Sequence, residues 1–354
     1  SPKLRRLPIL RRLCLLTLKR LLIDIYGDFS FLRCYNSFMT TILSNVLSIF
    51  LIIAAGFAAS KAGIIKKEAD KHFVTLIMSI TMPCMIITSI TSKEFNSDLG
   101  MATAEAFILG TLFFVFTFIL GYLICKKVLK VSPKEDLGVY VLAFSSINNG
   151  FMGFPITQAI FGNDILYFMI LHNIMLNLYL YSAGPFILNM NSEKGKFNIK
   201  YFLKTLCNPS TAVSAVSIVM LFSGLHLPPL AFDTLDLIGS ITVPLSMLLV
   251  GVQLADSNIA RIIKNRHLLA VSVIKMISVP ILTFLAINWL PVDTYVKIAI
   301  IFGGAFPTAV ITSAITAIEG KNSLLAAETV ALTTLLSIAV IPAAALLLTS
   351  YYGL

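Results

Sequence analysis

Charged residues are scarce in this chain: they make up 12% of its 354 residues, whereas hydrophobic residues make up 57%. That balance, with a mean hydropathy of +0.90, excludes a soluble globular protein and is typical of a protein with several membrane spans. The basic excess gives a formal net charge of +10, but it lies in short clusters between long apolar runs, as topology signals do. We therefore expect no nucleic-acid partner.

Motifs for metal binding and for hydrolysis are also missing. The five cysteines stand apart, with no CxxC pair and no Cys/His cluster, so neither a metal site nor a redox dithiol is predicted. No Ser/His/Asp or Cys/His set falls at one depth in the apolar runs, and no phosphate-binding loop is present. We expect no enzyme activity, no metal and no cofactor.

The first 38 residues contain eight Lys or Arg residues, which interrupt every stretch that could cross a bilayer. They also interrupt the apolar core that a secretory signal needs. The open interpretations are an interfacial amphipathic helix, a transit-like peptide, and sequence that precedes the true start at Met39. We favour the last, in which residues 1–38 are a basic prefix outside the native protein.

Ten apolar runs follow Met39, each near the ~20 residues that a helix needs to cross a bilayer. The predicted fold class is therefore an all-α polytopic membrane protein with ten transmembrane helices. The connections are short, so function must lie within the membrane. The predicted spans are 40–60, 72–91, 102–125, 137–161, 165–189, 207–225, 231–254, 267–290, 295–318 and 323–349.

Basic residues alternate between the connections. The connections after odd spans carry four, four, four, three and one Lys or Arg, against at most one after each even span. The positive-inside rule places the odd connections in the cytoplasm. Both ends of the ten-helix core then lie on the outer side of the cell membrane. An outer N-terminus conflicts with a basic prefix, which is a second reason to exclude the prefix.

A pentapeptide occurs twice, as SITMP at 79–83 and as SITVP at 240–244. At the same offset of 161 residues Gly63 meets Gly224, so a five-span unit is predicted to occur twice. Because five is odd, the second copy is inverted, as in many secondary transporters. The predicted domains are 39–190 and 207–354, joined by a cytoplasmic connection at 191–206.

The fourth and ninth spans carry helix-weakening residues at their centres. The fourth reads AFSSINNGFMGFPITQAIFG over 143–162 and the ninth AIIFGGAFPTAVITSAITAIEG over 299–320. An offset of 158 residues places Asn149 on Pro307 and Gly162 on Gly320. Backbone groups that glycine and proline release at membrane depth are tolerated only where they line a cavity.

Matching breaks in two halves are the best sequence indication of a transporter's binding site. The alternative is that these residues serve packing or a kink, which is as plausible as function for Pro83 and Pro244. Two adjacent amides at midspan favour a site. The predicted substrate-binding residues are Asn148, Asn149, Gly150, Gly153, Pro155, Gly303, Gly304, Pro307 and Thr308.

The motifs INNGFMGFPITQAIFG, SITMP with SITVP, and FPTAVITSAITAIEGKNSLLAAETVALTTLLSIAVIP resemble the auxin efflux carrier family, in its bacterial branch of malate and malonate permeases. The resemblance covers roughly residues 39–349. It implies two inverted five-helix repeats in which helices four and nine are broken and cross near the midplane. In plant members a carboxylate lies near the crossing prolines with an asparagine from each broken helix. Here the second break has no asparagine beside Pro307, so Thr308 and the backbone of 303–305 would serve.

An anion is also what the broken helices favour physically. Half-helices that begin after Asn149 and after Pro307 would point their positive N-terminal ends toward the midplane. Lys275 lies nine residues past Arg266, which at 1.5 Å per residue is ~13 Å into a ~30 Å core. It would offer a counter-charge, unless it extends toward the cytoplasm.

Three further residues are predicted to support transport or coupling. Glu328 reaches a depth similar to that of Lys275 and could pair with it or carry a proton. Asn173 and Asn177 share one helix face and would line the substrate path or bond to another helix.

The sequence thus predicts a secondary transporter of a small carboxylate, such as malate or malonate, working by alternating access across the cell membrane. The alternatives are a sodium-coupled symporter of the bile-acid type, a channel, and a transporter-like receptor. Expected partners are the carboxylate and membrane lipid. Proton coupling, sodium coupling, uniport and a homodimer are all open.

Overall fold

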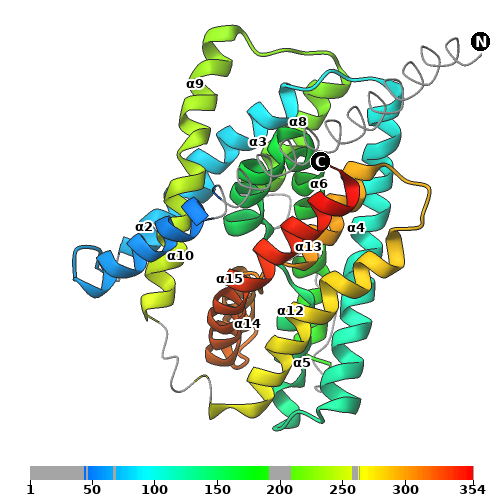
Figure 1. Cartoon of the computed structure of the whole chain (residues 1–354). Coiled ribbons are helices and arrows are strands. Elements are labelled where there is room, and N and C mark those ends of the chain that lie inside the picture. Colours follow the sequence, from blue (N-terminus) through cyan, green and yellow to red (C-terminus); the bar gives the residue numbers. More distant parts are fainter. Residues whose placement is uncertain are drawn as a thin grey trace, which may run out of the picture. The chain divides into compact units, whose positions relative to one another are not determined.

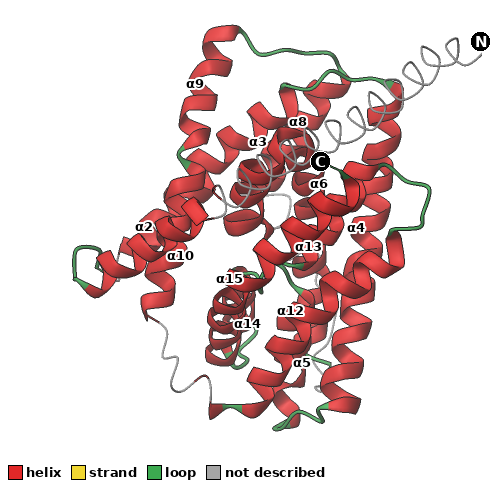
Figure 2. Cartoon of the chain, in the orientation of Figure 1, coloured by secondary structure: helices red, strands yellow, loops and turns green. Residues whose placement is uncertain are grey.

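Every regular element that the computed structural model describes is a helix, and no strand occurs in that part of the chain (Figure 2). The described residues are 44, 47–66, 69–190, 209–256, 262 and 264–353. The labelled helices belong to one compact unit, Val46–Leu354. The predicted prefix, 1–38, and the whole of the predicted connection, 191–206, lie outside the described residues.

The helices follow the apolar runs of the sequence (Figure 1). Those of the first half are Leu47–Lys61, α2 (Ala69–Leu76), the π-helix η1 (Ile77–Thr81), α3 (Met82–Thr91), α4 (Ser97–Leu123), the π-helix η2 (Ile124–Val128), the 3-10 helix η3 (Lys134–Asp136), α5 (Leu137–Ser145), the π-helix η4 (Asn149–Gly153) and α6 (Phe154–Leu188). Those of the second half are α8 (Pro209–Phe222), α9 (Pro229–Ser240), α10 (Thr242–Asp256), α12 (Arg266–Ile287), α13 (Thr294–Gly304), α14 (Ile311–Ile318) and α15 (Ser323–Tyr352).

Six helical stretches in the described residues are long and apolar enough to cross a membrane. Five of them coincide with one predicted span each. The sixth, Lys134–Leu188, covers both 137–161 and 165–189, and its backbone leaves the helical conformation at Gly162. Three shorter apolar helices, Leu47–Lys61, Pro209–Phe222 and Thr294–Gly304, fall in the remaining predicted spans.

Several helices end at glycines in the left-handed conformation. Gly63 and Gly224 have φ of 74° and 65°. In both turns the next N–H donates to the carbonyl oxygen five residues earlier, at 3.0 Å, which is the bond of a Schellman cap. Gly162 and Gly320 have φ of 74° and 66°. Glycine takes this conformation without a Cβ clash, so each position stops its helix sharply.

The two SIT-x-P repeats fall where one helix passes into another. Pro83 is the second residue of α3, directly after the π-helix η1. Pro244 is the third residue of α10, which begins two residues after α9 ends. Proline is tolerated in a first helical turn because it lacks the N–H that would stay unpaired there.

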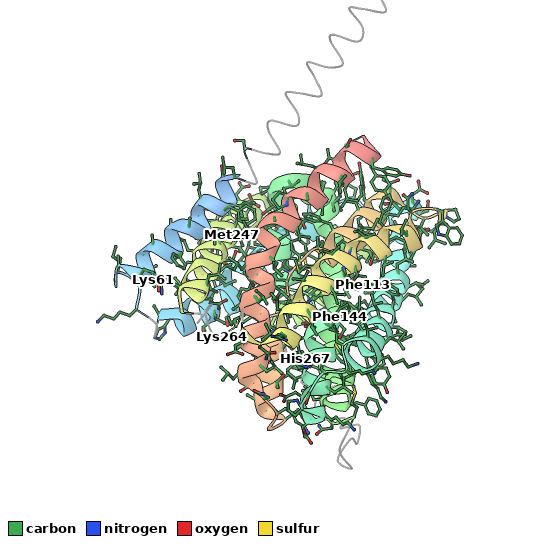
Figure 3. The ribbon with its side chains drawn as sticks, turned by 60° about the horizontal axis from the view of Figure 1, so that its bottom comes forward. Lys61, Phe113, Phe144, Met247, Lys264 and His267 are labelled. Carbon is green, nitrogen blue, oxygen red and sulfur yellow. The ribbon has the colours of Figure 1, made fainter. Side chains whose placement is uncertain are left out.

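Two groups of helices build the core around the interruptions. In one group α3 packs on α8 and α9, and the helix Leu47–Lys61 crosses α10 backbone to backbone. In the other, α4 packs on α5 and α6, and α12 packs on α13 and α15 (Figure 1). In Figure 3, Phe113 and Phe144 are buried side chains, whereas Lys61 and Lys264 are exposed.

Candidate functional site

The first interruption lies between α5 and η4, as predicted for the fourth span. Ser146 is extended, with φ −85° and ψ 148°, and Asn148 has φ −93° and ψ 66°. The chain resumes as η4 at Asn149, and the Asn148 side chain caps this turn by accepting from the N–H of Phe151 at 3.3 Å. Pro155 then lies in the first turn of α6.

The second interruption lies between α13, which ends at Gly304, and α14, which begins at Ile311. Gly303 and Gly304, predicted as substrate-binding residues, are still helical and close the C-terminal end of α13. Gly303 is needed for a different reason: a Cβ there would lie 2.7 Å from Nδ1 of His172. The buried ring nitrogens of His172 have no hydrogen-bond partner among the described residues.

The two interruptions are bonded to each other. The N–H of Asn148 donates to the carbonyl oxygen of Pro307 at 2.8 Å. The hydroxyls of Ser146 and Thr312 are 2.8 Å apart, and the hydroxyl of Thr308 donates to the carbonyl oxygen of Ala143 at 2.7 Å. Segments about 160 residues apart in sequence, one in each half, thus meet at one point.

Lys275 of α12 holds the same point from a third side. Its side chain is fully buried, and Nζ donates to the carbonyl oxygens of Ala143 at 3.0 Å and Ser146 at 2.6 Å, and to the hydroxyl of Thr308 at 2.8 Å. An ammonium has three N–H donors, so all three have an acceptor. Two of the acceptors are carbonyls at the C-terminal end of α5, where the helix dipole is negative.

Lys275 therefore does not pair with Glu328, although their similar predicted depths had made such a pair possible. Its bonds within the described part of the chain go to neutral oxygens. Glu328 lines a separate cavity of about 190 Å³ with Asp136, Tyr140 and Asn265, among others.

A cavity of about 40 Å³ adjoins the first interruption. Five of the predicted site or supporting residues line it: Asn148, Asn149, Gly150, Asn173 and Asn177. From the second interruption it is lined by residues after Thr308, and among the described residues no charged side chain lines it. The other lining residues are Met78, Met82, Ile147, Phe151, Leu176, Ser210, Ala309, Val310 and Ile311.

Asn149 is the most unusual side chain of this cavity. It is fully buried, and neither its amide nitrogen nor its amide oxygen has a hydrogen-bond partner among the described residues. Leaving a buried amide unpaired costs about 1–3 kcal/mol for each group. Such a group in a native structure needs an explanation, and a ligand is one.

The other asparagines differ in their engagement. The Asn177 amide donates to the hydroxyl of Thr211 in α8 at 2.9 Å, which is the interhelical bond named as its alternative role. Asn173 is nearly buried beside it on the cavity wall.

The remaining predicted site residues do not line the cavity: Gly153, Pro155, Gly303, Gly304, Pro307 and Thr308. Thr308 is engaged with Ala143 and Lys275, and its N–H donates to the hydroxyl of Thr333 at 3.0 Å. Pro83 and Pro244 also lie outside the lining, although Met82, next to Pro83, is part of it.

Comparison with known families decides the class of this protein. A family model described as membrane transport protein matches residues 41–344. The chain belongs to this family. This membrane transport protein family includes the auxin efflux carriers, so the resemblance to the auxin efflux carrier family is confirmed. The chain is a membrane-embedded transporter of this family.

Two relatives of this membrane transport protein are archaeal. An uncharacterized transporter of Methanocaldococcus jannaschii is 28% identical over 217 residues, or 59% of this chain and 68% of the relative. An uncharacterized transporter of Methanothermobacter thermautotrophicus is 24% identical over 153 residues, or 43% of this chain and 49% of the relative. Both matches agree with the family, and neither name specifies a substrate.

Proposed function

We propose that this chain transports a small organic anion, a carboxylate such as malate or malonate, across the cell membrane by alternating access. The observation that carries the proposal is the buried amide of Asn149, which has no hydrogen-bond partner in the described part of the chain and lies in a cavity beside two bonded helix interruptions. A carboxylate accepts hydrogen bonds from amide nitrogens and from a helix N-terminus, and η4 begins at Asn149.

The charge of Lys275 favours the same class of cargo. Its ammonium is fully buried and bonded to Ser146, two residues before the cavity-lining Asn148. A cation at membrane depth needs a counter-charge, and its three acceptors are neutral. An anion in the adjoining cavity supplies that charge.

We further propose ten spans arranged as two inverted five-helix repeats, with the domains predicted above and odd connections in the cytoplasm. The matched Schellman caps at Gly63 and Gly224 support this arrangement, as do the left-handed Gly162 and Gly320. The packing pairs are also matched: α4 on α5 and α6 has its counterpart in α12 on α13 and α15.

The size of the cavity supports a moving mechanism. A cavity of about 40 Å³ holds at most a few water molecules, since each needs ~10–15 Å³ of such space. A carboxylate therefore enters only if the helices around the cavity separate. We propose that the two groups of helices rock against each other around the interruptions.

The test is counterflow in proteoliposomes loaded with malate, malonate, citrate or an aromatic acid. At least one radiolabelled acid should exchange with saturable kinetics. Asn149→Ala should lower its exchange by about 10-fold or more, because a hydrogen bond to a charged group contributes ~1.5–3 kcal/mol.

Asn163→Ala is the matched control, because Asn163 is exposed and its side chain accepts a hydrogen bond from Gln158 at 3.2 Å, so this variant should exchange normally. Normal exchange by folded Asn149→Ala would contradict the site. Flux that neither saturates nor shows counterflow would identify a channel instead.

A further inference from the structure

We propose that His172 of α6 is the proton-binding residue of this transporter, so that the anion crosses the membrane together with a proton. The inference rests on the proposed transport of a carboxylate and adds the coupling ion. His172 is the neighbour in sequence of Asn173, which lines the cavity, and it does not line the cavity itself.

The His172 side chain is fully buried, and neither of its ring nitrogens has a hydrogen-bond partner among the described residues. A neutral imidazole carries one N–H donor and one acceptor nitrogen, so both groups lose their hydrogen bonds to water and gain none. Packing alone would be served by an apolar side chain of similar size. A function in another state of the protein explains why a histidine is present here.

Uncharged groups of two neighbouring helices enclose the ring. On α4, the ring centroids of Phe113 and Phe114 lie 4.8 Å and 5.1 Å from that of His172, and Phe113 is labelled in Figure 3. On α13, the ring lies against Gly303, where a Cβ would be 2.7 Å from Nδ1. Among the described residues no carboxylate bonds to the ring.

Two titratable side chains belong to the same neighbourhood. Tyr179 of α6 stacks on Phe114 with ring centroids 5.1 Å apart, and its hydroxyl bonds to that of Ser145. Lys275 donates to the carbonyl oxygen of Ser146. Both are engaged with other groups, so His172 is the side chain here with nitrogens available for a proton.

Access of water to the ring depends on Ile147 of the first interruption. Ile147 lines the cavity, and its Cδ1 lies 3.5 Å from the place of a Cβ on Gly303, the same place that the His172 ring contacts. In this arrangement the imidazole is neutral, because a buried charge without an acceptor is costly. When the cavity widens and Ile147 moves, water reaches a side chain that readily gains a proton near neutral pH.

The proton also balances the charge of a dicarboxylate. Malate and malonate each carry two carboxylates, whereas Lys275 supplies one positive charge and bonds to neutral oxygens. Among the described residues no charged side chain lines the cavity. An imidazolium at His172 adds the second positive charge close to the cavity, where charges interact strongly away from water. Loss of the proton on the other side of the membrane then weakens the binding of the anion.

Uptake into proteoliposomes driven by a pH gradient tests the inference, with the radiolabelled carboxylate that shows counterflow and with the membrane potential held at zero by potassium and valinomycin. With the outside about one pH unit more acidic, the wild type should accumulate label up to about 10-fold, the ratio of the proton gradient. A proton ionophore should abolish the accumulation and leave counterflow intact. Protein-free liposomes give the background.

His172→Gln and His172→Asn replace the imidazole with an amide that takes up no proton near neutral pH. Both should keep counterflow at saturating anion, with a higher KM, and should lose accumulation. A mere loss of packing would lower both measurements together. His226→Gln serves as the control, because His226 is exposed beyond the end of α8 and this variant should accumulate label like the wild type.

A folded His172 variant that accumulates label like the wild type would overturn the inference, and so would an equal loss of counterflow and accumulation. If neither variant can be purified, a pH dye trapped in wild-type vesicles decides: unlabelled anion added outside should acidify the interior, and no acidification overturns the inference. A wild type that exchanges the anion without accumulating it overturns proton coupling and keeps anion transport. No exchange of any carboxylate overturns transport itself.

Discussion

Asn149 and Lys275 are both buried polar side chains in an apolar protein, but they differ in their hydrogen bonding. Lys275 gives each of its three N–H groups an acceptor, so its burial is compensated by hydrogen bonds. Asn149 is equally buried and has no partner among the described residues. Lys275 holds the two interruptions together, whereas the unpaired amide of Asn149 lowers the stability of the protein beside the cavity.

Replacement of Asn149 by leucine should therefore separate stability from transport. Leucine has the same branching and number of heavy side-chain atoms as asparagine but no amide, so Asn149→Leu should raise the melting temperature by a few degrees, or ~1–2 kcal/mol, while exchange is lost. Thermal unfolding and counterflow measured on the same preparation check this.

Asn177→Leu provides the contrast. Its amide donates to Thr211 at 2.9 Å, so its removal leaves that hydroxyl unpaired and should lower the melting temperature. A lower melting temperature for Asn149→Leu would show that the amide has a partner and would count against Asn149 as a ligand-binding residue.

Helix contacts depend on glycines whose role the amino-acid pattern does not reveal. A Cβ on Gly251 of α10 would lie 2.0 Å from the carbonyl oxygen of Ile53, and one on Gly56 would lie 2.2 Å from that of Leu248. The helix Leu47–Lys61 and α10 thus approach closely because both contribute a glycine at the crossing, as small residues permit in membranes.

Gly251→Ala should separate these two helices and destabilise the protein by about 1–3 kcal/mol, the usual range for overpacking. Gly184→Ala is the matched control, near the C-terminal end of α6. Its Cβ would have ordinary contacts of 3.8–3.9 Å, and alanine raises helix propensity by about 1 kcal/mol. Melting temperatures that fell equally in both variants would contradict the close crossing.

Much of the element-level structure could be predicted from the sequence, because helix boundaries and breaks depend on local residues. Gly63, Gly224 and the NNG motif marked stops and an interruption that the backbone shows. The partners of Lys275 could not be predicted, because they are backbone oxygens that only folding brings to it. The cavity wall from Met78, Met82 and Ser210 was missed for the same reason: apolar or small residues carry no chemical signal.

For the whole molecule, the proposed inverted repeat fixes which connections face the cytoplasm. The connection between the third and fourth spans includes the exposed Glu135, and the exposed Ser223 directly follows α8 at the end of the sixth span, toward the seventh. The first is predicted to lie inside the cell and the second outside, because basic residues gather on the cytoplasmic side.

Cysteine labelling checks this orientation in a background without the five native cysteines. A membrane-impermeant maleimide should label Ser223→Cys in intact cells and Glu135→Cys only after permeabilisation. The reverse pattern would invert the topology, and labelling of both in intact cells would rule out a membrane between them.

Hydrogen bonds of the Ser146, Thr308 and Lys275 side chains join the two interruptions. At the same point the amide hydrogen of Asn148 is donated to the carbonyl oxygen of Pro307. Its deuterium uptake should be slow while the halves remain joined and should accelerate with each separation. The exchange rate of this one hydrogen therefore reports how often the transporter opens.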